Sequence, residues 1–270
     1  MKHNSIFGTE DGRTMRRILV FFGILAICGL LISPMLFTIS TIADGGSSGS
    51  STTNHCGAEY LATWNGISGR VKACDNSVGY KVENGVVLPW DVSDQINGFL
   101  SDDYKSWAQI GYIKGYKLDP NGNLHLFIEC WFPATQKYWS PYLSGSYNTL
   151  LQIITPNSWH TLEIRCWPQE GYDAVVFSMD GKIIKICNIG SNYPVLRRLQ
   201  GVCEISTTSA TMMGEWQSMQ YILRTGRQGS TYLYYNWPSS TPFYDYNPYP
   251  YPPYHCVIDS QNSFHNVAGW

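Results

Sequence analysis

A long hydrophobic run lies near the N-terminus. Residues 18–43 contain no charged side chain and are interrupted by one proline, Pro34. A membrane-spanning helix needs about 20 apolar residues, whereas the apolar region of a cleaved signal peptide has only about 7–15. We therefore predict a transmembrane signal-anchor helix over residues 18–43. Thr41 and Ala43 also have the small-residue spacing of a signal-peptidase site, so cleavage near Ala43, with secretion of the remainder, is the alternative.

The flanks of this run predict its orientation. Arg13, Arg16 and Arg17 precede it, and no basic residue follows closely. By the positive-inside rule, residues 1–17 lie in the cytoplasm and everything after residue 43 lies outside. Residues 44–55 are rich in glycine and serine and form a flexible linker. The sequence thus predicts a single-pass protein of the cell membrane with an extracellular domain.

Beyond the linker, apolar residues recur with period two or in short runs rich in β-branched and aromatic residues, and no amphipathic helix of ten or more residues is found. Residues 107–118 and 123–132 flank the sequence Asp-Pro-Asn-Gly and predict a β-hairpin. Residues 174–179 and 182–189 flank Asp180-Gly181, which suits a type I′ turn. Further strands are expected at residues 80–82, 86–90, 148–154, 159–167, 201–207 and 216–224.

Many strands joined by hairpins, without crossover helices, predict an all-β fold: an antiparallel two-sheet sandwich over residues 56–231, with a barrel as the alternative. Residues 232–270 begin with a stretch rich in proline and tyrosine, and proline blocks a regular strand ladder. We expect these residues to form a C-terminal arm packed along the sandwich. An exposed adhesive tail is the other interpretation.

Composition removes several classes of function. The 270 residues have a net charge of −2 with only 14% charged residues, so a disordered polymer and a basic nucleic-acid binder are excluded. The sequence has no glycine-rich phosphate loop and no H-E-x-x-H motif, and no cofactor or metal is expected. Asp119, Asn121 and Asn123 alternate as calcium ligands do, but a hairpin turn explains them more simply.

Cysteines give a separate prediction about disulfides. One cysteine, Cys28, lies in the hydrophobic run and seven lie beyond it: Cys56, Cys74, Cys130, Cys166, Cys187, Cys203 and Cys256. Outside the cytoplasm these seven are expected to oxidise, and the odd number leaves one thiol over. Cys56 with Cys74, and Cys187 with Cys203, are the short-range pairs that we expect, although spacing does not fix connectivity.

The order of several strand motifs resembles the concanavalin A-like lectin/glucanase superfamily. These motifs are WAQIGYIKG, LFIECW, WHTLEIRCW, YDAVVFSMDGKIIKI and GEWQSMQYI, within about residues 100–225. The resemblance implies two large sheets stacked as a jelly roll. The laminarinase-type hydrolases of this superfamily carry an E-x-D-x-x-E strand that is absent here, so a retaining glycosidase of that plan is not expected.

A more specific resemblance is to the glutamic peptidases, the eqolisins, which activate water with a glutamine and a glutamate. Gln109 in WAQIGY resembles the glutamine of the family's L-Q-x-G pattern, and Glu215 in GEWQ resembles the glutamate of its A-E-W segment. Glu129, followed by Cys-Trp-Phe-Pro, resembles the family's Y-E-W-F-P motif. The resemblance thus implies Gln109, Glu215 and Glu129 as candidate catalytic residues.

All tryptophans and tyrosines lie beyond residue 58, and flat aromatic rings stack well on the apolar faces of sugars. Candidates for ligand binding, chosen because they lie on strands near the polar candidates, are Trp107, Tyr112, Trp131, Trp139 and Trp216. Three functions follow as hypotheses. The first is a membrane-anchored module that binds a polysaccharide or another cell-surface polymer, the second an acid-active glutamic peptidase, and the third a structural surface protein.

Overall fold

A computed structural model of the chain describes residues 54–83, 86–90, 92–100, 105–145, 148–169, 172–190, 195–205, 209–225, 231–245 and 253–269. The predicted transmembrane segment 18–43 and most of the linker lie outside these ranges. Among the described residues, no helix has both the length and the apolar character that a membrane span requires.

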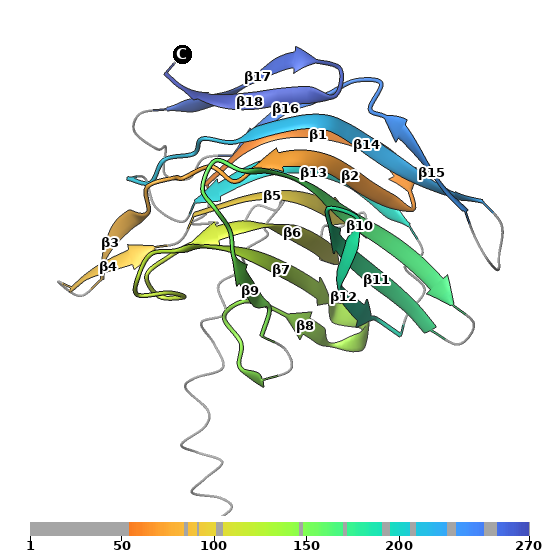
Figure 1. The fold of residues 1–270 in the computed structure, drawn as a ribbon, viewed down its shortest axis with the longest axis horizontal. Helices are drawn as coiled ribbons and strands as arrows, with labels where there is room; N and C mark the ends of the chain where they lie inside the picture. The colour runs from red at the N-terminus through yellow and green to blue at the C-terminus, as the bar shows by residue number, and fades with distance from the viewer. Residues whose placement is uncertain are drawn as a thin grey trace, which may run out of the picture. The chain divides into compact units, whose positions relative to one another are not determined.

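Two eight-stranded sheets lie face to face and account for most of the described residues (Figure 1). The first, here called sheet A, has the strand order β16 (Thr241–Asp245), β1 (Asn54–Trp64), β13 (Leu196–Ile205), β5 (Val92–Phe99), β6 (Trp107–Lys114), β7 (Leu124–Phe132) and β8 (Lys137–Trp139), and β9 (Leu150–Ile153) also pairs with β7.

The second sheet, here called sheet B, has the order β12 (Lys182–Asn188), β11 (Tyr172–Met179), β10 (Trp159–Gln169), β2 (Gly66–Lys72), β14 (Glu215–Thr225), β18 (Ser263–Ala268) and β17 (Tyr254–Ser260), and β15 (Thr231–Asn236) also pairs with β14. A separate hairpin joins β3 (Gly79–Glu83) to β4 (Val86–Trp90), and a 3₁₀ turn spans Pro133–Thr135. The described strand pairs are antiparallel, so the predicted sandwich is confirmed.

Both predicted hairpins are present. In β11–β12, Asp180 and Gly181 have φ values of 51° and 77°, the positive values that a type I′ turn requires. In β6–β7, Gly122 has φ 69°. Asp119 orders that turn, since its carboxylate accepts hydrogen bonds from the backbone N–H of Asn121 at 2.9 Å and from Nδ2 of Asn123 at 2.7 Å. These hydrogen bonds are those of a hairpin turn. Among the described residues, no group of three or more His, Cys, Asp or Glu side chains could hold a metal ion.

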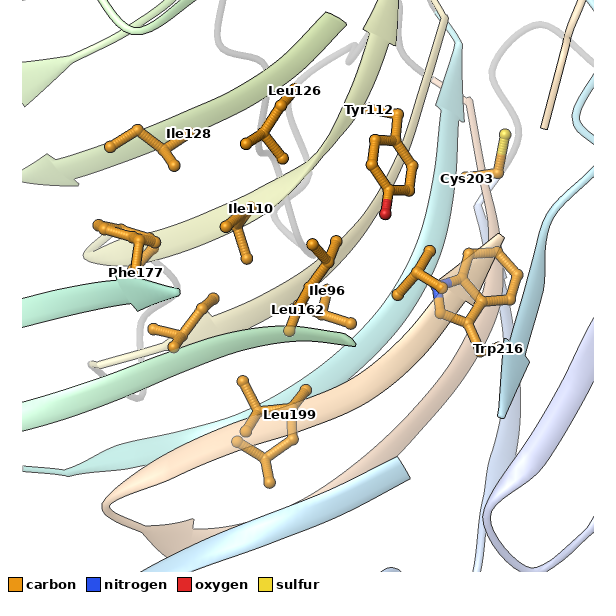
Figure 2. Packing of buried hydrophobic residues seen from close by; sticks show 14 of the residues in the cluster. Ile96, Ile110, Tyr112, Leu126, Ile128, Leu162, Phe177, Leu199, Cys203 and Trp216 are labelled. Carbon is orange, nitrogen blue, oxygen red and sulfur yellow. The ribbon is translucent and has the colours of Figure 1, made fainter. Parts of the chain in front are cut away.

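The core lies between the two sheets. Alternate residues of β6 and β7, such as Ile110 and Ile128, point from sheet A toward Leu162 and Phe177 of sheet B, and all four are fully buried (Figure 2). Burial of such side chains is the main free-energy term that holds two sheets together. Strand alternation then leaves every second residue of sheet A on the side that faces away from sheet B.

The C-terminal region differs from the arm that the proline content predicts. It forms four strands, of which β16 extends sheet A at β1, while β15, β17 and β18 belong to sheet B. Proline at position 242 lies in β16, an edge strand, where a missing N–H is tolerated. Phe264 of β18 is 1% exposed and stacks on Trp216 at 5.1 Å. These strands are therefore integral to the sandwich.

The expected disulfides are not formed in the structure. All seven described cysteines are buried free thiols. Cys56 lies opposite Cys203 across β1 and β13, and Cys187 contacts Cys130 of the other sheet. Buried cysteines pack as small apolar side chains, and burial raises the pKa of Cys166 above its usual range.

We expect Trp216→Ala to lower the free energy of unfolding by about 3–5 kcal/mol, because it removes a fully buried ring and leaves a cavity. The indole Nε1–H of Trp216 also donates to the backbone oxygen of Gln95 at 3.1 Å. Urea unfolding followed by circular dichroism measures the effect. Trp167, which is 37% exposed, is the matched control, and Trp167→Ala should change stability by no more than about 0.5 kcal/mol. Equal losses in the two variants would contradict the described packing.

Candidate functional site

The face of sheet A that points away from sheet B carries an unusual number of polar side chains; we call it the outer face. In β6, Ala108, Ile110 and Tyr112 belong to the core, so Trp107 and Gln109 point to the outer face. Cross-strand register extends this assignment. The row through Gln109 contains Glu59, Gln200, Asn97 and Glu129 on β1, β13, β5 and β7.

A glutamine–glutamate pair lies at the centre of one half of this face. Gln109 and Glu129 are directly opposite in the β6–β7 register, and Gln109 Nε2 donates to Glu129 Oε2 at 3.0 Å. The hydroxyl of Tyr138, on β8, donates to the other carboxylate oxygen of Glu129. Gln109 and Glu129 are 0% and 1% exposed. The structure thus brings together two of the three predicted catalytic residues.

The surroundings of Glu129 favour its protonated form. Burial raises the pKa of Glu129 to about 8, and repulsion from the Glu204 carboxylate adds to the rise. Hydrogen bonds from Tyr138, Ser140 and Gln109 act in the opposite direction but do not cancel it. At neutral pH Glu129 is therefore mostly an uncharged acid that can give up a proton.

A second glutamine–glutamate pair lies on the same face. Gln95 of β5 donates from Nε2 to Oε2 of Glu204 on β13 at 3.0 Å, and the Oγ of Ser93 donates to Gln95 Oε1 at 3.4 Å. The other oxygen of Glu204 is 3.7 Å from His55 Nε2. Gln95 and Glu204 are 1% and 3% exposed. Neither residue was predicted from the sequence.

The sequence contains only part of the pattern that would identify the Gln95–Glu204 pair. Ser93, Gln95 and Asn97 alternate along one short segment, which is the pattern of a polar strand face. Their partner Glu204 comes 109 residues after Gln95 in the chain, and only the pairing of β5 with β13 places the two together.

Several buried polar atoms on the outer face have no hydrogen-bond partner. They include Asn97 Oδ1, Gln109 Oε1 and Trp107 Nε1. A buried polar group without a partner costs about 1–3 kcal/mol, so such groups are rare in folded proteins and mark places where a ligand or water binds. Two acceptors and one donor are thus free on neighbouring strands β5 and β6.

Aromatic rings border these polar groups. Trp107 lies opposite Trp131 across β6 and β7, and Trp131 meets Tyr138 edge to face with ring centroids 5.8 Å apart. Trp107 packs with Phe99 in a small hydrophobic cluster separate from the core, and Trp131 and Tyr138 pack against this cluster. Trp131 and Tyr138 are only partly buried, so they form the accessible edge of the site.

Other predicted site residues lie elsewhere. Glu215 is at the start of β14 in sheet B, and the next residue, Trp216, points into the core, so Glu215 points away from sheet A. Its carboxylate pairs with Lys72. Gln109 and Glu215 therefore lie on opposite sides of the sandwich, and the predicted Gln109–Glu215 catalytic pair is not assembled.

Three of the aromatic candidates belong to the core. Tyr112 and Trp216 are 0% exposed and Trp139 is 9% exposed, and all three contact buried residues between the sheets. Their role in the described structure is packing. Trp107 and Trp131 are the two candidates that the structure places beside the Gln109–Glu129 pair.

Comparison with known proteins gives structural similarity without sequence similarity. No protein-family model and no curated protein matches the sequence. Scytalido-glutamic peptidase, solved with a peptide-based transition-state analogue, is 10% identical with a TM-score of 0.46, covering 80% of this chain and 98% of that chain. SCP-B, a member of the eqolisin family, gives 9% identity and a TM-score of 0.44 with the same coverage.

Carbohydrate-binding module CBM66 from Bacillus subtilis is 10% identical with a TM-score of 0.29, covering 55% of this chain and 78% of that chain. The sequence identity to each of these three structures is 10% or less.

We expect Glu129→Gln to flatten the pH dependence of stability. The folded state keeps the Glu129 proton up to about pH 8, whereas the unfolded chain releases it near the ordinary value of 4.5. The stabilising contribution is therefore complete below about pH 4.5 and is lost as the pH rises to about 8. Urea unfolding between these limits should show a falling free energy in the unmodified protein and a shallower fall in the variant.

Burial also raises the pKa of Asp94, but this residue is the same in both proteins, so the difference between the two curves reports on Glu129. Parallel curves would mean that Glu129 is ionised in the folded state across this range.

Proposed function

We propose that this protein binds a neutral polysaccharide on the outer face of sheet A. The observation that carries this proposal is the set of unpartnered buried atoms, Asn97 Oδ1, Gln109 Oε1 and Trp107 Nε1, beside partly accessible aromatic rings. Sugar hydroxyls both donate and accept hydrogen bonds, and the apolar faces of sugar rings stack on tryptophan and tyrosine. One ligand class thus satisfies both the polar and the aromatic groups.

The electrostatics of the face support an uncharged ligand. Glu129 is mostly protonated at neutral pH, and the amides of Gln95, Asn97 and Gln109 are neutral. The two ends of the face differ, since Glu204 lies near His55 while Glu129 lies near Tyr138. A polymer lying across β13, β5, β6 and β7 would meet amides in the middle and a glutamate at each side.

We expect Trp131→Ala to weaken binding of soluble neutral glucans by about tenfold or more, because a stacking ring at the accessible edge is lost. Isothermal titration calorimetry with laminarin, barley β-glucan and dextran, and pull-down with insoluble cell-wall polysaccharide, measure the effect on the full-length protein. Trp167→Ala, on sheet B, is the control and should bind as the unmodified protein does. Absence of binding to every polysaccharide would instead favour the structural role for a surface protein.

We further propose that residues 18–43 hold this domain at the outer side of a membrane, with residues 1–17 in the cytoplasm. The length of the uncharged run and the arginines before it support this orientation. A surface location places the outer face of sheet A within reach of envelope polymers through the linker of residues 44–55.

Deletion of residues 1–43 should move the protein from the membrane fraction to the soluble fraction of lysed cells. Protease added to intact protoplasts should degrade the domain of the full-length protein, because that domain lies outside. A full-length protein that is already soluble after carbonate extraction, or that is protected from protease, would contradict the proposed topology.

A further inference from the structure

A serine, a histidine and an aspartate form a chain of hydrogen bonds on sheet B. Ser158 immediately precedes β10, His160 is the second residue of that strand, and Asp180 lies in the turn between β11 and β12. Ser158 Oγ is 2.9 Å from His160 Nε2, and His160 Nδ1 is 2.7 Å from Asp180 Oδ2. A nucleophile, a base and a group that orients the base occur in this order in serine hydrolases.

The β11–β12 turn fixes the aspartate. Asp180 has a φ of 51°, which the type I′ turn requires, and its backbone N–H donates to the backbone oxygen of Thr161 at 2.8 Å. Its side-chain Oδ1 accepts a hydrogen bond from the backbone N–H of the same threonine at 2.9 Å. Two hydrogen bonds to one residue of β10 therefore hold the carboxylate, and Oδ2 remains for the imidazole.

These contacts assign the protons of the imidazole. A carboxylate only accepts hydrogen bonds, so Nδ1 of His160 carries the proton that Asp180 binds. In the neutral ring, Nε2 then keeps a lone pair that faces Ser158 Oγ. The ring of Tyr112 packs beside the imidazole, with the ring centroids 6.2 Å apart, and limits its rotation. His160 is thus held in the tautomer that a general base requires.

The hydroxyl of Ser158 has two acceptors within reach. It donates to the backbone oxygen of Thr155 at 2.6 Å, and rotation about the Cβ–Oγ bond turns the same proton toward His160 Nε2. Residues 155–157 are exposed, and the His160 side chain is 23% exposed, so small molecules can reach both groups. The site therefore offers an accessible nucleophile beside its base.

The backbone around the serine favours esters over amides as substrates. The N–H of Ser158 donates to the oxygen of Thr155 at 3.3 Å, and the N–H of Asn157 donates to the oxygen of Ala73 at 2.7 Å. Neither group is free to stabilise an oxyanion, and one such donor contributes about 10²–10³-fold to the rate. Esters have a better leaving group than amides and depend less on this stabilisation.

We propose that Ser158, His160 and Asp180 hydrolyse small carboxylic esters. Ser158 is the nucleophile, His160 is the general base and then the general acid, and Asp180 is the residue that positions His160. This activity is independent of the proposed polysaccharide binding, which uses sheet A.

The reaction consumes one water for each ester. Ser158 Oγ bonds to the carbonyl carbon while His160 Nε2 takes its proton, and the same nitrogen returns that proton to the alcohol oxygen as the carbon–oxygen bond breaks. Water, deprotonated by His160, then attacks the acyl ester on Ser158, and the serine oxygen leaves with the proton that His160 holds. One ester and one water thus become one carboxylic acid and one alcohol.

The test uses the full-length protein with p-nitrophenyl acetate and a fluorophosphonate probe. We expect release of p-nitrophenol above the rate in buffer, and a covalent adduct that peptide mapping places on Ser158. Ser158→Ala should abolish the adduct and lower the hydrolysis rate about 10²-fold or more, because proton transfer by a positioned base contributes about 10²–10⁴-fold. Circular dichroism and thermal unfolding check that the variant folds.

Asp180→Asn tests the positioning role while keeping the turn, because asparagine also favours a type I′ turn. Its amide donates to His160 Nδ1, which moves the imidazole proton to Nε2 and removes the lone pair that faces Ser158. Hydrolysis should fall as in Ser158→Ala, and nitrogen-15 NMR of His160 should show the proton on Nε2. An aspartate with a purely structural role would not change tautomer and rate together.

His265→Gln is the matched control for a reactive surface imidazole. His265 Nδ1 is 2.8 Å from Asp259 Oδ2, much as His160 pairs with Asp180. Its replacement should leave both the hydrolysis rate and the adduct unchanged. An equal loss of rate in His265→Gln and His160→Gln would mean that unspecific imidazole catalysis explains the activity, and would overturn the assignment.

The other outcomes are equally decisive. A rate that survives Ser158→Ala, or an adduct on a different serine, overturns Ser158 as the nucleophile. Absence of both hydrolysis and adduct overturns the catalytic proposal, and the hydrogen bonds then only tie the β11–β12 turn to β10. Glucan binding should be the same in Ser158→Ala and in the unmodified protein, so failure of polysaccharide binding and failure of ester hydrolysis are distinguished.

Discussion

The hydrogen bond from Gln109 to Glu129 joins β6 to β7 in a place where neither side chain reaches solvent. A buried carboxyl group without a basic partner is stabilised when it keeps its proton and when its oxygens accept hydrogen bonds. Gln109 and Tyr138 supply those bonds to Glu129, and Gln95 donates a hydrogen bond to Glu204 on the neighbouring strands. The hydrogen bonds between polar side chains on the outer face therefore follow from the burial of their carboxyl groups.

The core of the sandwich holds these polar residues in position. Ile96, Ile110 and Ile128 alternate with Gln95, Gln109 and Glu129 along β5, β6 and β7, so packing on one side of sheet A fixes the geometry on the other. Gly111 allows β5 and β6 to approach each other closely, because a Cβ at this position would lie 2.1 Å from the backbone oxygen of Asp94. A shift of register by one residue would turn both glutamates into the core, which ties the site to the fold.

Local sequence features predicted the parts of the fold that depend on local interactions. The turns at Gly122 and at Asp180-Gly181 identified the β6–β7 and β11–β12 hairpins, and the first of these already places Gln109 near Glu129. Strands β1, β5 and β13 pair across long stretches of chain, so Glu204 and Gln95 could not be brought together from sequence. The motif around Glu215 resembled a catalytic segment, yet Trp216 occupies the core and turns Glu215 away from Gln109. Proline content gave no indication of the C-terminal strands, since Pro242 lies at a sheet edge.

One hydrogen bond joins the two ends of the described chain and can form only late in synthesis. Asn266 is fully buried and donates from Nδ2 to the backbone oxygen of Cys56 at 2.9 Å. This hydrogen bond joins β18 to β1, and its two residues are 210 positions apart in the chain. During synthesis β1 emerges long before β18 and has no such partner until residue 266 has been added. Contacts of this separation make folding slow and leave sheet edges open in the meantime. This hydrogen bond between β1 and β18 can therefore form only after residue 266 has been synthesised.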